Sequence, residues 1–438
     1  MTRRWALALS AVAAVSLTAC EPDSATNPGP EGQEDFARYA AIGTSLSMGV
    51  TNGDNAVVYF YQQHSWPALL ARQAGNTGFT QPLMRSPGCF PPIIAPLALG
   101  RNLRGQSIAT TDTSCAGLLP GIAAPTATTS FNNVALSGAL TTYALNITPE
   151  IAAQGGLGAE ASNSSAVFRR KAYPLVLPPG KSQVTAAMMQ NPTFVSIELG
   201  ANEVLGGPTS GVIAPGVNVV PPQFWQPEYD KVIDSIETTG AKVMLVTVPR
   251  VSSIIGMRTG AELHADSANF KNRFNVTVLS SCKDNTNLIF TPRLVPGTIA
   301  FAAANPTVPV GISCLNNPSA TVTQPDYALT PADVATLNAF VDAMNEHIAS
   351  VAETNGWALL DANAVLAEIV AGKPTYSVVR QMTCVIPYGP FIGLDGVHPT
   401  SAGYVKVANA AIAEVNGHYG FELPTIAEEP PNYAALCP

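Results

Sequence analysis

Charged residues are scarce in this chain. Asp, Glu, Lys and Arg make up 12% of its 438 residues, whereas a typical soluble protein has about a quarter. The 22 basic residues form no cluster, and the formal net charge is −8. A nucleic-acid partner requires grouped Lys and Arg side chains against the phosphates, so the composition argues against one.

Metal-ligand patterns and long apolar runs are also missing. The chain has no C-x-x-C pair, and no histidine lies within four residues of a cysteine, so we expect no metal site such as a structural zinc. Beyond the first twenty residues, no uncharged apolar run has the length of a membrane helix. Apolar residues nevertheless make up 47% of the chain, which is enough for a sizeable core, and 37 prolines with 35 glycines indicate many rigid loops.

The first twenty residues are typical of an export signal. Two arginines precede an uncharged apolar stretch over residues 5–17, which is too short to span a membrane. Residues 17–20, Leu-Thr-Ala-Cys, resemble a bacterial lipobox, in which the cysteine becomes the lipid-bearing first residue of the mature protein. We therefore predict a lipoprotein signal peptide over 1–19, lipidation at Cys20 and a flexible tether over 20–35. An ordinary cleaved signal that happens to contain a cysteine is the alternative.

This reading places the protein in the bacterial cell envelope, anchored by lipid to the outer membrane if the organism has one. The compartment is oxidising, and six cysteines remain after Cys20. An even number of cysteines in an exported protein suggests disulfides, here with 15 possible connectivities. Because each sequential pair lies in or brackets a loop-rich segment, we predict the pairs Cys89–Cys115, Cys282–Cys314 and Cys384–Cys437.

Short apolar segments that stop at polar or turn residues predict the sheet. They lie at residues 38–42, 133–136, 193–199, 242–248 and 357–360. Helical patterns separate them, the clearest of which begins at Thr330 with a capping sequence and leads into the last segment. Continuous apolar strands alternating with helices predict an α/β fold, a three-layer α/β/α sandwich with a five-stranded parallel, flavodoxin-like sheet.

The remaining segments read as insertions into a single domain over residues 36–438. They lie at about 85–130, 148–180 and 251–325. The third is too long for an unstructured loop in a compact domain, so it forms either a small disulfide-linked cap or surface decoration against proteolysis. Near residue 395 an apolar loop is a candidate lining for an acyl pocket, and its apolar residues are Met382, Val385, Ile386, Tyr388, Phe391 and Ile392.

Polar residues follow three of the predicted strands, where ligands bind in open α/β sheets. These are Ser45 in Gly-Thr-Ser-Leu-Ser, Gly138 after the second segment, and Asn202 in Gly-Ala-Asn-Glu. A fourth polar cluster, Asp395-Gly-Val-His398, lies near the end of the chain. In order and residue type, these blocks resemble those of the SGNH hydrolases, also called the GDSL esterase/lipase family. The resemblance extends from Ser45 to His398, which is most of the mature chain.

The resemblance implies a serine hydrolase that needs no cofactor. A serine hydroxyl becomes a good nucleophile when an imidazole takes its proton, and a carboxylate holds the imidazole in one tautomer. Ser45, His398 and Asp395 would fill these roles. The oxyanion hole implied by the resemblance consists of the backbone N–H groups of Ser45 and Gly138 and the side-chain amide of Asn202.

Each of these residues also has a plainer reading. Ser45 could cap a helix, Gly138 could simply end a strand, Asn202 could form an Asx turn, and His398 could be structural. Two positions depart from the family pattern, because Thr44 and Glu203 stand where aspartate is usual.

We expect a monomeric, lipid-anchored hydrolase that cleaves carboxylic esters through an acyl-enzyme. Its substrate would be an acyl ester, a lipid or an acetylated carbohydrate. The alternative is a non-catalytic surface lipoprotein that uses the same fold as a binding module, which Thr44, Glu203 and the insertions would favour. The alternative does not explain why a serine, a histidine and an aspartate all stand in the positions of the family blocks.

Overall fold

A computed structural model describes residues 32–158 and 163–437 of the chain. The predicted signal peptide over 1–19, the lipidation site Cys20 and most of the tether over 20–35 lie outside these residues. The first described element is the short 3-10 helix η1 (Gln33–Phe36), which falls at the end of the expected tether. Its Phe36 is buried and stacks on Phe194 at 4.2 Å between ring centroids, so the packed fold already includes this turn.

The central sheet is parallel and runs in the order β1-β2-β3-β9. Its strands are β1 (Tyr39–Gly43), β2 (Phe194–Glu198), β3 (Lys242–Val246) and β9 (Ala358–Leu360). These are four of the five predicted strands, and in β1–β2 pairing Ile42 lies opposite Ile197.

The remaining predicted strand, residues 133–136, lies along the edge of β1 that does not pair with β2. A parallel bridge joins Ala41 to Asn133, and the N–H groups of Val134 and Leu136 donate to the carbonyls of Ala41 and Gly43, both at 3.0 Å. Strand β1 therefore has residues 133–136 on one side and β2 on the other. This reversal of strand order creates a topological switch point at the carboxyl end of β1.

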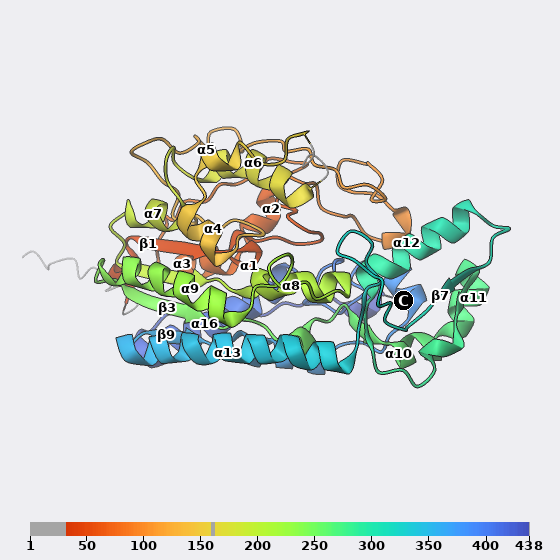
Figure 1. Ribbon diagram of the computed structural model, residues 1–438. Helices are drawn as coiled ribbons and strands as arrows, with labels where there is room; N and C mark the ends of the chain where they lie inside the picture. The colour runs from red at the N-terminus through yellow and green to blue at the C-terminus, as the bar shows by residue number, and fades with distance from the viewer. Residues whose placement is uncertain (1–31, 159–162, 438) are drawn as a thin grey trace, which may run out of the picture.

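Helices cover both faces of the sheet and make it the middle of three layers (Figure 1). On one face lie α7 (Gln183–Met188), α9 (Pro222–Glu237) and α13 (Pro331–Asn355), and on the other α3 (Trp66–Gln73) and α16 (Ser401–Tyr419). Successive strand side chains point to opposite faces. Thus Ile42, Ile197 and Leu245 are buried in the first core, and Ala41, Phe194 and Met244 in the second. The predicted α/β/α sandwich is confirmed.

Local sequence signals explain where the longest helix begins and ends. The Thr330 side chain accepts a hydrogen bond from the N–H of Asp333, and the Asp333 carboxylate accepts one from the N–H of Thr330, which forms a capping box. Pro331 occupies the first turn, where its missing N–H costs nothing. Gly356 ends the helix with a φ of +63°, a conformation that glycine adopts readily.

The other helices are shorter and connect these layers. They are α1 (Ser45–Met48), α2 (Tyr59–Gln62), α4 (Thr141–Asn146), α5 (Pro149–Ala152), α6 (Ser164–Val176), α8 (Ala201–Ser210), α14 (Ala362–Ala371), α15 (Val378–Thr383) and α17 (Tyr433–Leu436). None of the helices in the described ranges is both long and apolar enough to cross a membrane.

The third insertion folds into a compact cap at one end of the molecule (Figure 1). Two small sheets organise it, β4-β6-β8 and β5-β7. Their strands and the cap helices are β4 (Met257–Thr259), α10 (Gly260–Ala265), α11 (Ser267–Phe274), β5 (Val276–Val278), β6 (Leu288–Phe290), α12 (Thr291–Ala304), β7 (Val310–Ile312) and β8 (Ala328–Leu329). The cap side chains Leu263, Phe270, Ile289 and Val295 form a hydrophobic core together with residues outside the insertion, such as Leu97 and Val378, which supports the cap interpretation over loose surface decoration.

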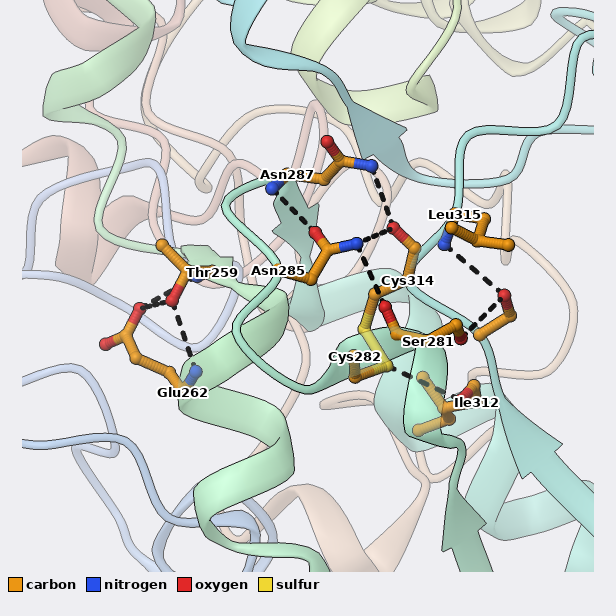
Figure 2. Close-up of a disulfide and its surroundings, with 10 residues drawn as sticks. Thr259, Glu262, Ser281, Cys282, Asn285, Asn287, Ile312, Cys314 and Leu315 are labelled. Atoms are coloured by element: carbon orange, nitrogen blue, oxygen red, sulfur yellow. Dashed lines mark hydrogen bonds between the residues drawn. A yellow bond between two sulfur atoms is a disulfide. The ribbon is translucent and has the colours of Figure 1, made fainter.

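All three sequentially paired disulfides are present, which confirms the predicted connectivity. Figure 2 shows Cys282–Cys314 within the cap, where two asparagines reinforce it. The side-chain amides of Asn285 and Asn287 both donate to the carbonyl of Cys314, at 3.3 and 2.8 Å. In this way the disulfide and the amides together tie β7 to the chain before β6.

Candidate active site

The four polar segments meet at the carboxyl edge of the central sheet. Ser45 follows β1, Gly138 follows the 133–136 segment, and Asn202 lies in the first turn of α8 after β2. The turn from Asp395 to His398 closes the same edge from the far end of the chain. Parallel strands end on a common edge, so the topology brings together residues that are up to 353 positions apart in sequence.

Ser45 is the first residue of α1, directly after the β1 strand and Thr44. Its side chain is largely buried, with 6% of the residue exposed. The hydroxyl makes no hydrogen bond to the described part of the chain, whereas the neighbouring Thr44 and Ser47 hydroxyls both donate to Glu198. Among the hydroxyls of this turn, Ser45 alone is thus left available for a substrate.

His398 and Asp395 form a buried pair. His398 Nδ1 lies 2.7 Å from Asp395 Oδ2, and the two residues are 5% and 7% exposed. The same carboxylate accepts hydrogen bonds from three backbone N–H groups, those of Gly53 at 2.8 Å, Val397 at 3.0 Å and His398 at 2.9 Å. The carboxylate is therefore fixed, and it orients the imidazole with Nε2 directed away from it.

Electrostatics keep this carboxylate ionised. Burial by itself raises the pKa of Asp395, but the charge of His398 and the hydrogen bonds to the carboxylate outweigh burial, and the pKa lies below its ordinary value. An ionised Asp395 can stabilise the imidazolium that forms when His398 accepts a proton.

The three groups predicted as oxyanion donors each have an N–H without a partner in the described structure. Asn202 Nδ2 donates to the carbonyl of Ala139 at 2.9 Å, which ties α8 to the turn containing Gly138. A primary amide has two N–H donors, so one remains available. The backbone N–H groups of Ser45 and Gly138 also make no hydrogen bond within the described chain. Gly138 has a φ of +70°, and a Cβ there would lie 3.1 Å from Asn55 Oδ1, so glycine suits this turn.

A small apolar cavity opens beside the serine and the histidine. Ser45, Asn202 and His398 lie on its wall, and its volume is about 100 Å³. The rest of the wall is mostly aliphatic and includes Val251, Ile254, Ile255, Val365, Leu366, Ile369 and Ile392. Gly138 does not line this cavity. No hydrogen bond joins Ser45 to His398 in the described structure; catalytic contacts of this kind often tighten only when substrate binds.

A second, larger cavity of about 790 Å³ lies on the other side of Asp395. The first insertion forms one wall and helix α12 of the cap forms the other. Across its mouth Arg293 forms an ion pair with Asp54. Both insertions thus border the space next to the Asp395–His398 turn.

The apolar loop before Asp395 contributes less to the pocket than the sequence suggested. Only Ile392 lines the small cavity, whereas Met382 lines the large one and Val385 is 44% exposed. The loop is occupied by the Cys384–Cys437 disulfide and by packing of Phe391 against α14, which keeps its other side chains away from Ser45.

Two buried glutamates beside the site were not identified from sequence as site residues. Glu198 at the end of β2 is 4% exposed, and Glu203 in α8 is 2% exposed. Burial raises the pKa of both carboxyls, that of Glu203 to about 7. A sequence signal existed for Glu198, because it is the one charged residue in a buried strand.

The remaining histidines have other surroundings. His347 Nε2 lies 2.6 Å from Asp230 on the surface of α9, and ring nitrogens of His64 and His418 contact backbone carbonyls. In the described ranges, no three His, Cys, Asp or Glu side chains are grouped so as to hold a metal ion.

Comparison with known proteins gives structural matches only. No protein-family model and no curated protein sequence matches the chain. An acetyl-xylooligosaccharide esterase from Geobacillus stearothermophilus is 10% identical, with 86% of this chain and 93% of that chain covered at a TM-score of 0.35. An alpha/beta hydrolase enzyme from the metagenome of Lake Arreo, Spain, is 12% identical, with 87% and 98% covered at 0.34.

An extracellular lipase from Streptomyces rimosus is 16% identical, with 87% of this chain and 98% of that chain covered and a TM-score of 0.32. Identity and superposition are low in every case. The chemistry of this protein therefore has to be inferred from its own side chains.

Proposed function

We propose that the protein is a serine hydrolase that cleaves carboxylic esters. One observation carries the proposal: the His398 ring, held by Asp395 at 2.7 Å, shares the wall of a small apolar cavity with the unpaired hydroxyl of Ser45. A base that is held by a carboxylate and a free nucleophile thus face a space that a substrate can enter.

The reaction follows from these positions. His398 Nε2 accepts the hydroxyl proton as Ser45 Oγ bonds to the acyl carbon, and the carbonyl oxygen becomes an oxyanion. The N–H groups of Ser45 and Gly138 and the free amide N–H of Asn202 stabilise that charge. The imidazolium then returns the proton to the departing alcohol and leaves an acyl-enzyme. A water molecule repeats the sequence, releases the acid and restores the serine.

The small cavity favours a short acyl chain. An apolar cavity of about 150 Å³ can hold benzene, which has six carbons. By proportion, the cavity of about 100 Å³ accommodates about four carbons. Its wall is mostly aliphatic, which favours an unsubstituted acyl chain over a charged one. We therefore propose that acetyl to butyryl esters are preferred over long-chain lipids, and that an acetylated carbohydrate remains within this range.

The location of the protein is also part of the proposal. Residues 17–20 and the even set of cysteines support export and attachment to the cell envelope through lipid on Cys20. Metabolic labelling with a fatty acid that carries a clickable group should mark the wild-type chain but not Cys20→Ala.

The first experiment measures hydrolysis of p-nitrophenyl esters from acetate to palmitate by oxidised protein that starts after Cys20. We expect Ser45-dependent activity with a maximum at or below about four carbons, and a loss of at least about 1,000-fold in Ser45→Ala. Equal rates for the wild type and a folded Ser45→Ala would refute the enzyme and favour the binding-module alternative. A maximum at palmitate would instead refute the assignment of the acyl pocket.

A further inference from the structure

Glu198 holds the turn that carries the proposed nucleophile. Its carboxylate Oε2 accepts the backbone N–H of Thr44 at 2.9 Å and the N–H and hydroxyl of Ser47 at 3.3 and 3.0 Å. Oε1 accepts the Thr44 hydroxyl at 2.7 Å. Both flanks of Ser45 are thus attached to one side chain, which comes from a different strand.

The arrangement is tightly packed and has no counter-ion. In the described part of the chain, no Lys, Arg or His forms an ion pair with Glu198, although the residue is 4% exposed. Four donors on one buried carboxylate take the place of a cation. A Cβ on Gly43 would overlap the Ser47 hydroxyl and lie 3.0 Å from Glu198 Oε2, so the turn closes around the carboxylate only because residue 43 is glycine.

Burying a carboxylate without a cation is costly, and a core stabilised only by packing would be apolar here. The contact with Glu198 also explains why position 44 is a threonine, where the family pattern has an aspartate. A hydroxyl can donate to Glu198, whereas an aspartate carboxylate in its place would face another carboxylate at hydrogen-bond distance. We propose that Glu198 is a positioning residue for catalysis, which fixes the turn over residues 43–47 and so the direction of Ser45 Oγ. This inference rests on the proposed esterase function.

Glutamine provides a conservative replacement. Its carbonyl oxygen at the Oε2 position would still accept the three donors there, and its amide nitrogen at the Oε1 position would donate to the Thr44 hydroxyl, which can rotate to accept. Alanine removes all four hydrogen bonds. Ser196 supplies the matched control, because it lies two residues earlier on β2, is fully buried and bonds Tyr39 rather than the turn over residues 43–47.

The test measures kcat and KM for p-nitrophenyl butyrate in Glu198→Ala, Glu198→Gln and Ser196→Ala, together with thermal unfolding of each oxidised protein. For Glu198→Ala we expect kcat to fall about 100-fold with KM changed less than about threefold, since misplacement of about 1 Å can cost that much. Glu198→Gln should recover to within about tenfold of the wild type. Ser196→Ala should lower the unfolding temperature and leave kcat within about twofold.

Two results would overturn the inference while leaving the esterase intact. One is a folded Glu198→Ala with wild-type kcat, and the other is Glu198→Gln as impaired as Glu198→Ala, which would show that charge rather than position matters. If Glu198→Ala does not fold, the double variant Thr44→Val/Ser47→Ala removes both hydroxyl donors and should lower kcat at least about tenfold. Absence of Ser45-dependent activity in the wild type would instead reject the proposed function itself.

Discussion

Glu203 should make the stability of this protein depend on pH in a direction opposite to most acidic side chains. Its Oε1 accepts the N–H of Thr141 at 2.6 Å, whereas its buried Oε2 has no hydrogen-bond partner in the described structure. Burial is the main reason why the pKa of Glu203 rises from 4.5 to about 7, and the nearby Glu198 charge adds to it. The folded protein therefore keeps a proton on Glu203 at pH values where the unfolded chain has lost it.

The sign and size follow from proton linkage. Between pH 4.5 and about 7 the folded state binds more protons than the unfolded state, so the free energy of unfolding falls as pH rises. The favourable contribution is fully present below pH 4.5 and is lost above about 7. At about 1.4 kcal/mol per pKa unit, the loss is about 3 kcal/mol.

The Glu203→Gln variant isolates this contribution, because its amide does not titrate. Urea unfolding of oxidised protein at pH 5 and pH 8.5 should show the variant gaining about 3 kcal/mol relative to the wild type between the two pH values. All other side chains are the same in both proteins, so the difference between the two isolates Glu203. The control Glu422→Gln changes an exposed glutamate, and its free energy of unfolding should change between the two pH values as in the wild type. If the free energy of unfolding of Glu203→Gln changed with pH as in the wild type, the raised pKa of Glu203 would be refuted.

Two further predictions concern the site itself. Asn202→Ala removes one oxyanion donor and should lower kcat about 100- to 1,000-fold with folding retained; an unchanged kcat would exclude Asn202 from the oxyanion hole. Ile369→Val enlarges the acyl cavity and should raise kcat/KM for hexanoate relative to butyrate, by up to about tenfold. Ile233→Val is the matched control, since both isoleucines lie on helices and are 4% exposed, but Ile233 packs in the core against the sheet. An equal change of the hexanoate-to-butyrate ratio in both variants would contradict the cavity assignment.

The contacts of Glu203 bear on its departure from the SGNH pattern that the sequence resembles. Glu203 binds the first N–H of α4, and Thr141 in turn accepts the indole N–H of Trp225 at 2.8 Å. Together with the Asn202–Ala139 contact, this fixes the chain on both sides of Leu140. Glutamate at this position is thus compatible with an ordered turn at Gly138, the proposed oxyanion donor.

Local patterns in the sequence were sufficient for the main elements of the fold. The apolar strands are buried on both faces, so their composition alone identified them, and the Thr330 capping box marked the start of α13 at the correct residue. The strand at 133–136 was also found, although it pairs with β1 through only a short ladder. The disulfide pairs could be predicted because each bond joins two cysteines that follow one another along the chain and lie in or bracket one loop-rich segment.

The interior of the cap and the lining of the acyl cavity were not predictable in this way. Strands of two or three residues, such as β8, carry too little periodicity to be recognised, and the cavity wall draws on side chains from η4 (Val251–Ser253), α14 and the last loop. Which apolar side chain faces a cavity depends on how separate elements pack. For this reason Ile392 lines the cavity beside Ser45, whereas the neighbouring Phe391 packs against α14.

The sequence by itself determined the α/β class, the positions of the strands along the chain and the residue types of the proposed triad, since these depend on local propensity and on short motifs. Only the tertiary structure decided that Glu198 binds both flanks of Ser45, that Gly53 helps fix Asp395 and that the cavity beside Ser45 is small. Those features depend on distances between segments that lie far apart in the chain, and a distance of this kind exists only once the sheet has brought its carboxyl ends to one edge.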